Sequence, residues 1–254
     1  MENLGHLALL LAAAFTAGTL NAVAGGGSFL TLPALVFTGV PPVIANATGT
    51  VALLPGYIAG AWGFKDDMQS PPGLSMKQVV ALSLIGGSAG AALLLFTPDA
   101  TFRKVVPWLL LAATAMFAFG PQLRAWASGK NADHAVTSAA KAAAGMLIVA
   151  IYGGYFNGGL GILLLALFGL LGQTSLNAMN GMKNLVSALL TAIAVVIYAV
   201  GGIVEWKLAF IMMVAATLGG YLGARTARKI APHVLRWGIV ATGLVMAGLF
   251  FARG

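Results

Sequence analysis

One basic residue, Lys183, lies in an apolar stretch of the sequence that is long enough to cross a lipid bilayer. It belongs to the run 177–184 (NAMNGMKN), and apolar residues dominate from there to Val200. Counted as helix from Thr174, Lys183 lies about 13 Å along the axis, near the middle of a hydrocarbon core about 30 Å thick. An unpaired charge at that depth costs at least about 2.5 kcal/mol. Lys183 is therefore predicted to attract an anion. The alternatives are a structural lysine bonded to helix-end carbonyls, or a shifted segment in which Lys183 reaches the surface.

Uncharged hydrogen-bonding groups and glycines could complete such a site. Thr50 occupies the place of Lys183 in the other half of an internal duplication described below, so one half supplies a charge and the other supplies hydroxyl groups. Backbone N–H groups at a helix N-terminus also favour anions. Each polar residue could instead form a hydrogen bond between helices. The candidate substrate-binding residues are Lys183, Thr48, Thr50, Asn180, Asn184, Asn21, Gly25, Gly26, Gly27, Ser28, Asn157 and Gly159.

Several kinds of chemistry lack the residues that they need. All acidic residues lie in predicted loops or at segment ends; they are Glu2, Asp66, Asp67, Asp99, Asp133 and Glu205. Cation transporters and proton relays generally need a carboxylate inside the membrane. The absence of such a carboxylate from the apolar segments counts against both functions. The histidines are too scattered for a metal site, and without cysteine there is no disulfide or thiol ligand. We expect no catalytic residues, no cofactor and no metal, and therefore no enzyme.

Composition places the chain in a membrane. Of its 254 residues, 59% are apolar and only 8% are charged, and the mean hydropathy is +0.93. A soluble domain is typically about 25% charged, so a soluble enzyme, a nucleic-acid binder and a secreted module are excluded. The net charge of +8 comes from short basic clusters between apolar runs, which suit loops that face an anionic leaflet. Residues 4–24 lack the basic start of a signal peptide, so we expect this segment to be retained.

The sequence also predicts an internal duplication. Glycines of the first half recur in the second: Gly86-Gly87 and Gly90 match Gly219-Gly220 and Gly223, and Gly18, Asn21 and Gly25 match Gly154, Asn157 and Gly161. The paired glycines at 86–90 and 219–223 are expected to be helix-packing surfaces. We predict a first transmembrane repeat at 1–124, a linker at 125–140 and a second repeat at 141–254. The predicted apolar segments are 4–38, 43–64, 78–97 and 104–120, then 141–171, 175–201, 207–224 and 234–252.

The opening segment of each half is too long for one crossing and is interrupted by glycine, at 25–28 and at 157–161. Glycine costs about 1 kcal/mol in a helix interior, and lipid tolerates unwound backbone only where protein or water covers it. We therefore expect two broken, re-entrant helices that meet near the midplane. With inverted halves and both termini outside, this arrangement gathers most basic residues on one face, as the positive-inside rule favours. The predicted fold is an all-α, polytopic transmembrane helical bundle of two repeats.

A set of motifs resembles the TauE/SafE sulfite exporter family, also called the 4-toluene sulfonate uptake permease group. In the first half the motifs are Asn21–Ser28, Pro33–Leu35, Gly39–Pro42 and Ala45–Thr50, and in the second half Asn157–Gly159 and Ala178–Asn184. The resemblance spans nearly the whole chain. It implies a carrier of sulfite, sulfonates, sulfoacetate or related organosulfur anions in the cytoplasmic membrane. The second half lacks the triple glycine and the Pro-Pro turn, so the two half-sites are expected to be chemically unequal.

Residues and resemblance together predict a secondary transporter, in the exporting direction, that moves a small sulfur-containing anion by alternating access around a midplane site. A non-transporting membrane protein that assembles or binds a partner is the alternative. A membrane-embedded transferase is a further rival, against which the lack of a carboxylate cluster argues. The expected partners are the anionic substrate and the bilayer, with no nucleic acid. The sequence leaves open the exact substrate, export versus import, the coupling ion and the oligomeric state, with a homodimer possible. It also leaves open whether the opening segments cross the membrane fully or are re-entrant.

Overall fold

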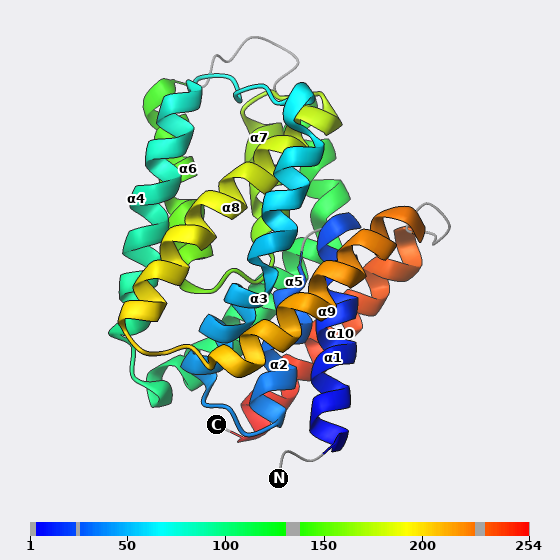
Figure 1. The fold of residues 1–254 in the computed structure, drawn as a ribbon. Helices are drawn as coiled ribbons and strands as arrows, with labels where there is room; N and C mark the ends of the chain where they lie inside the picture. The colour runs from blue at the N-terminus through cyan, green and yellow to red at the C-terminus, as the bar shows by residue number, and fades with distance from the viewer. Residues whose placement is uncertain (1–3, 24–25, 131–137, 227–231, 254) are drawn as a thin grey trace.

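The described part of the chain contains helices joined by loops and no strand, which confirms the predicted all-α fold class. The computed structural model describes residues 4–23, 26–130, 138–226 and 232–253. In chain order the helices are α1 (Leu4–Val23), α2 (Ser28–Phe37), α3 (Pro42–Gly63), the short 3₁₀ helix η1 (Lys65–Asp67), α4 (Met76–Leu95), α5 (Asp99–Lys130), α6 (Ala139–Tyr155), α7 (Leu160–Leu170), α8 (Leu176–Val200), α9 (Trp206–Thr226) and α10 (Pro232–Arg253). Figure 1 shows them as one bundle.

Four stretches of the described helices are long and apolar enough to cross a membrane: Leu4–Asn21, Pro42–Gly63, Met76–Leu95 and Leu176–Val200. Two later helices contribute shorter apolar stretches, Trp206–Leu222 and Gly243–Ala252. A chain with several such helices is a multi-pass membrane protein. Helix α5 continues to Lys130, into the segment that we expected to be the linker between the halves.

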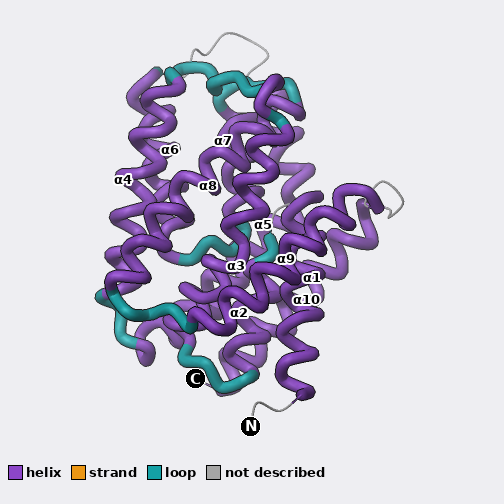
Figure 2. Tube along the Cα trace, viewed as in Figure 1, coloured by secondary structure: helices purple, strands orange, loops and turns teal. Residues whose placement is uncertain are grey.

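Both predicted breaks are present, and each opening segment folds back on itself as a helical hairpin. The rings of His6 at the start of α1 and Phe37 at the end of α2 are in edge contact, with centroids 6.4 Å apart. In the second hairpin, a Cβ on Gly145 of α6 would lie 2.9 Å from Cδ1 of Leu167, near the end of α7. Each hairpin therefore enters and leaves the bundle at the same end, as predicted for a re-entrant segment. Figure 2 shows the second break as a short loop in the middle of the molecule.

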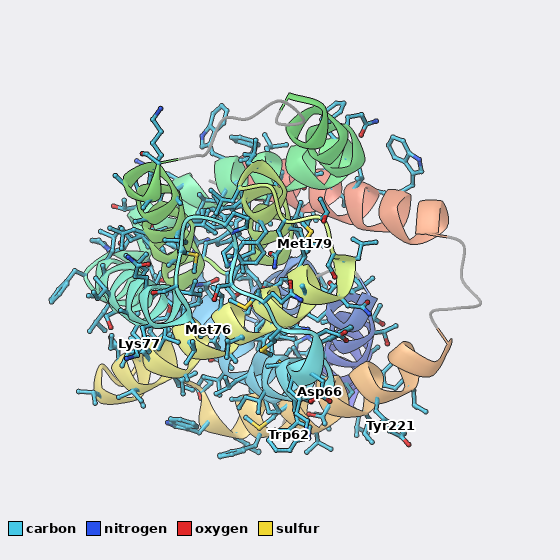
Figure 3. The ribbon with its side chains drawn as sticks, turned by 90° about the horizontal axis from the view of Figure 1, so that it is seen from above. Trp62, Asp66, Met76, Lys77, Met179 and Tyr221 are labelled. Atoms are coloured by element: carbon cyan, nitrogen blue, oxygen red, sulfur yellow. The ribbon has the colours of Figure 1, made fainter. Side chains whose placement is uncertain are left out.

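Helices α3 and α8 pack against each other in opposite directions. Gly60, near the end of α3, lies beside the amide of Asn184, near the start of α8, and Gly181 lies beside Phe64 and Met68 just beyond α3. The loop that precedes α8 closes the same end, because Gln173 Nε2 donates to the carbonyl of Gln69 at 2.8 Å. Figure 3 looks down on this end of the bundle. The opposite directions of these two helices are those expected for inverted halves.

Two further helix pairs hold the first half against the second through glycine. A Cβ on Gly18 of α1 would lie 1.9 Å from the carbonyl oxygen of Ala216 in α9, and one on Gly90 of α4 would lie 2.1 Å from that of Ile151 in α6. Gly219 of α9 meets α1 equally closely. Small residues allow such close approach of helices in membranes. The prediction that Gly86–Gly90 and Gly219 form packing surfaces is confirmed.

Candidate functional site

The second break, between α6 and α7, is closed by hydrogen bonds from three different helices. Its carbonyl groups accept from tyrosine and asparagine side chains: Gly154 from Tyr198 of α8, Tyr155 from Asn46 of α3, and Gly158 from Tyr152 of α6. Backbone groups that leave a helix inside a membrane need such partners, since no water replaces them. These bonds explain how the chain tolerates unwound backbone at this depth.

Asn157 joins the second break to the two central helices. Its Oδ1 accepts from the hydroxyl of Tyr57 in α3 at 3.2 Å, and its Nδ2 donates to Thr191 Oγ1 in α8 at 3.5 Å. Its backbone φ is 59°, a left-handed conformation that asparagine adopts more readily than most residues. Gly159, with φ of 73°, turns the chain into α7 against Ala113 of α5. Both polar ends of the Asn157 amide are therefore engaged in holding the fold.

The first break, between α1 and α2, is closed from within its own hairpin. Asn21 Oδ1 accepts from the backbone N–H groups of Gly26 at 2.9 Å and Gly27 at 2.8 Å. Asn21 Nδ2 has no hydrogen-bond partner among the described residues, although the side chain lies beside the Tyr57 hydroxyl. Tyr57 thus stands between the two breaks, which makes it a site residue that the sequence gave no reason to select. Gly25 lies outside the described residues.

The start of α2 carries two more buried hydroxyl groups without partners. Ser28 Oγ and Thr31 Oγ1 form no hydrogen bond with any described residue, and their residues are 5% and 1% exposed. Thr31 faces Gly49 of α3, where an added Cβ would lie 2.8 Å from Thr31 Oγ1. Ser28 is a predicted site residue, but Thr31 was missed. Its spacing of three residues from Ser28 is the signal that could have found it, because such residues share a helix face.

Lys183 lies deep in the bundle, as the sequence predicts. Its side chain is 2% exposed, and its ammonium forms no hydrogen bond or ion pair with any residue that the structure describes. Ser187 and Thr191, one and two turns further along α8, are also buried. Asn184 lies against Gly60, and Asn180 is partly buried one turn before it. A polar face of α8 therefore runs from Lys183 to Thr191, where Asn157 connects it to Tyr57.

The threonines of α3 do not join Lys183 in this conformation. Thr48 Oγ1 accepts from the backbone N–H of Glu205 at 3.0 Å, just before α9, so it caps another helix. Thr50 is buried. On α3, the residue at the level of Lys183 is Gly60, because it contacts Asn184, and Gly60 lies about 15 Å along the helix axis from Thr50. The structure thus brings together Asn21, Gly26, Gly27 and Ser28, and Tyr57 connects them to Asn157. Lys183 does not lie next to Thr48 or Thr50 in this conformation.

A cavity of about 940 Å³ lies elsewhere, between α1, α2, α10 and the starts of α3 and α5. Its walls are mostly apolar, and Asp99 and Arg103 are its charged lining residues. None of the predicted site residues that the structure describes lines this cavity. An apolar wall offers few hydrogen bonds to a hydrated anion, so the buried polar groups at the breaks are the better candidate site.

The fold and this buried polar centre define a class of protein. Two helical hairpins that unwind at the middle of a multi-pass bundle, beside antiparallel central helices, are an arrangement typical of secondary transporters. The family model described as "Sulfite exporter TauE/SafE" matches residues 10–250. The chain belongs to this family, as the motifs at Asn21–Ser28 and Ala178–Asn184 predict.

Curated relatives carry names of the same kind. A "Probable membrane transporter protein" of Haemophilus influenzae is 29% identical over 94% of this chain and 92% of its own length. "Probable membrane transporter protein ORF9" of a Sinorhizobium species is 27% identical over 95% and 90%, and "Probable membrane transporter protein YfcA" of Escherichia coli K12 is 26% identical over 95% and 88%. No solved structure matches the chain significantly. Family and relatives support a membrane transporter.

Proposed function

We propose that this protein is a secondary transporter that exports a small sulfur-containing anion, such as sulfite, a sulfonate or sulfoacetate, across the cytoplasmic (inner) membrane, and that it is not an enzyme. The observation that carries the proposal is the buried Lys183 ammonium, which has no acidic partner among the described residues. A cation in a low-dielectric interior is costly unless an anion accompanies it. The family's description supports a sulfur oxyanion as that anion.

In this mechanism Lys183 neutralises the anion while neutral donors orient it. The two hairpins and the helices α3 and α8 surround the site, and rocking of one half against the other would expose it to each side in turn. The described carboxylates of Asp66, Asp67, Asp99 and Glu205 lie outside the spanning helices or at a helix start. Proton coupling would therefore involve the substrate or Lys183 itself, and uniport down a gradient is an equal alternative.

The test is flux of sulfite and of sulfoacetate into proteoliposomes that contain wild type, Lys183→Met or the matched control Lys77→Met. Lys77 is an exposed lysine at the start of α4. We expect saturable flux in the wild type and in Lys77→Met, and none in Lys183→Met. Methionine also removes an uncompensated buried charge, so Lys183→Met should melt at the same temperature as wild type or higher.

Two results would contradict the proposal. Unchanged flux in Lys183→Met would return Lys183 to a structural role. Absence of flux in folded wild type for both anions would favour the alternative, a membrane protein that serves a partner without transporting.

A further inference from the structure

The two helix breaks differ in how completely their polar groups are paired. At the second break, tyrosine and asparagine side chains from α3, α6 and α8 occupy the free carbonyl groups, and both ends of the Asn157 amide are bonded. At the first break, Asn21 Oδ1 accepts from two backbone N–H groups, while Nδ2 lies beside the Tyr57 hydroxyl without a hydrogen bond of good geometry. The predicted duplication matches Asn21 with Asn157, but Asn21 lies in the last turn of α1 whereas Asn157 lies in the break itself, with a φ of 59°.

Unpaired donors are concentrated at the first break. Among the described residues, five buried side-chain polar atoms have no hydrogen-bond partner, and Asn21 Nδ2, Ser28 Oγ and Thr31 Oγ1 are three of them. Their residues are 8%, 5% and 1% exposed. A buried polar group without a partner costs about 1–3 kcal/mol. Three such groups within one short stretch leave donors that a ligand or water could pair with.

The unpaired atoms lie around the first turn of α2. Asn21 Nδ2 points at Gly27, because a Cβ built there would lie 3.0 Å from it. Ser28 is the first residue of α2, and Thr31 shares its face of the helix one turn later. Thr31 Oγ1 in turn packs against Gly49 of α3, where an added Cβ would lie 2.8 Å from it. The two glycines therefore allow the donors to pack closely against the neighbouring backbone.

The first turn of α2 adds a favourable field for a negative charge. Helix α2 has ten residues, and its N-cap, Gly27, has no side chain that could accept a hydrogen bond from the first turn. A helix N-terminus carries a partial positive charge. The N–H groups of Phe29 and Leu30 already donate to the carbonyls of Gly26 and Gly27, so the contribution of this terminus is its field and not free N–H groups. Asn21, Ser28 and Thr31 provide one amide donor and two hydroxyl donors beside it. This donor set matches a ligand with several acceptor oxygens and a negative charge.

We propose that the first break is the element that holds the transported oxyanion by hydrogen bonds from Asn21 Nδ2, Ser28 Oγ and Thr31 Oγ1, and that the second break is a fixed support. This inference rests on the proposed function. It adds the position of a binding site made of uncharged donors, and it adds Thr31 to the candidate binding residues. Uncharged donors hold an anion without forming an ion pair, which favours release during transport. Lys183 lies outside this group of donors: Gly60 marks its level on α3, and Gly49, which Thr31 faces, is about 16 Å away along the same helix.

The test measures sulfite and sulfoacetate binding to purified protein by titration calorimetry, together with flux. The variants are Ser28→Ala, Thr31→Val and Asn21→Asp; aspartate keeps an acceptor for Gly26 and Gly27 but removes the donor. Matched controls are Ser83→Ala, whose hydroxyl bonds to its own helix at Val79, and Thr114→Val, whose unpaired hydroxyl lies beside Gly243 of α10.

We expect Ser28→Ala and Thr31→Val each to weaken binding about tenfold or more, since hydrogen bonds to charged groups are strong. Asn21→Asp should weaken it further by repulsion, and both controls should stay within about twofold of wild type. The melting temperature of Ser28→Ala and Thr31→Val without ligand should equal or exceed that of wild type, because an unpaired polar group is removed.

The outcomes separate this inference from the proposed function. If Ser28→Ala and Thr31→Val bind like wild type while Lys183→Met loses flux, transport stands and the binding site at the first break is refuted. If these variants melt lower with unchanged affinity, the hydroxyl groups hold structural water, and the inference is equally refuted. If folded wild type binds neither anion, both proposals fail.

Discussion

The glycine contacts between helices predict that one substitution, glycine to alanine, has opposite effects at different positions. At Gly18 the new Cβ would lie 1.9 Å from the carbonyl oxygen of Ala216, whereas ordinary contact begins at 3.4 Å. Helices α1 and α9 would have to separate by about 1.5 Å, and a gap of about 1 Å already loses up to half of a dispersion contact. At Gly56 in α3 and Gly248 in α10, nothing lies within 4 Å of the new atom.

The expected magnitudes follow from these distances. Overpacking costs about 1–3 kcal/mol and occasionally more, and rigid backbone atoms at Gly18 place the cost at the upper end. Alanine regains about 1 kcal/mol of helix propensity at any of these positions. Gly18→Ala should therefore lose about 2 kcal/mol, and Gly56→Ala and Gly248→Ala should be neutral or gain up to about 1 kcal/mol. At about 2–4 °C per kcal/mol, Gly18→Ala melts about 4–8 °C below wild type.

The assay is thermal unfolding of purified protein in one detergent at one scan rate, followed by tryptophan fluorescence. Gly90→Ala tests the second helix pair, where the carbonyl oxygen of Ile151 would lie 2.1 Å from the added atom. A Gly18→Ala protein as stable as Gly56→Ala would refute the view that close backbone packing between α1 and α9 determines stability. Destabilisation by all variants alike would show that helix flexibility, not space, is what glycine provides.

Three further predictions concern individual contacts. At Asn157, glycine adopts the left-handed backbone without strain, whereas alanine is strained there by ~1–2 kcal/mol relative to glycine. Asn157→Ala should therefore melt at a lower temperature than Asn157→Gly in the same assay. Equal melting temperatures would argue against strain. Asp99→Ala removes the acceptor for the backbone N–H of Val43 at the start of α3 and should lower the free energy of unfolding by about 0.5–2 kcal/mol. Asp99→Asn keeps an acceptor oxygen and should retain most of the stability. An equal loss in both variants would show that the negative charge of Asp99, and not its hydrogen bond, is what stabilises the protein. Gly49→Ala would place a methyl group against Thr31 Oγ1. It should therefore weaken sulfite binding, measured by calorimetry, more than the control Gly56→Ala does. Equal affinities would show that sulfite does not bind beside Thr31.

The sequence predicted the course of the chain well, because helix formation and helix breaking are local. Apolar runs predicted each helix to within a few residues, except that α5 extends to Lys130. The glycines at 25–27 and 157–161 predicted both breaks, since unwinding depends on residues at the break itself. The burial of Lys183 also followed from its place in an apolar run. The linker and the duplication remain predictions.

The candidate site was predicted only in part, because its hydrogen bonds join distant segments. Asn21 binds residues in its own hairpin, which sequence proximity suggested. Tyr57 reaches Asn157 across 100 residues of chain, and Thr48 reaches Glu205 across 157. No local pattern reveals such pairs, so neither Tyr57 nor the bond between Thr48 and Glu205 was predicted. The assignment of Thr48 to the substrate remains a prediction.

The sequence by itself determined a multi-pass helical membrane protein with two broken hairpins and one buried cation, because hydropathy, glycine placement and charge act within a few residues. Only the tertiary structure decided which polar groups are already paired. Close approach at Gly18, Gly90 and Gly219 fixes which helix faces meet, and that packing closes the second break while it leaves Asn21, Ser28 and Thr31 with unpaired donors at the first. Packing geometry decides which polar groups at each break find a partner, because those partners come from segments far apart in the sequence.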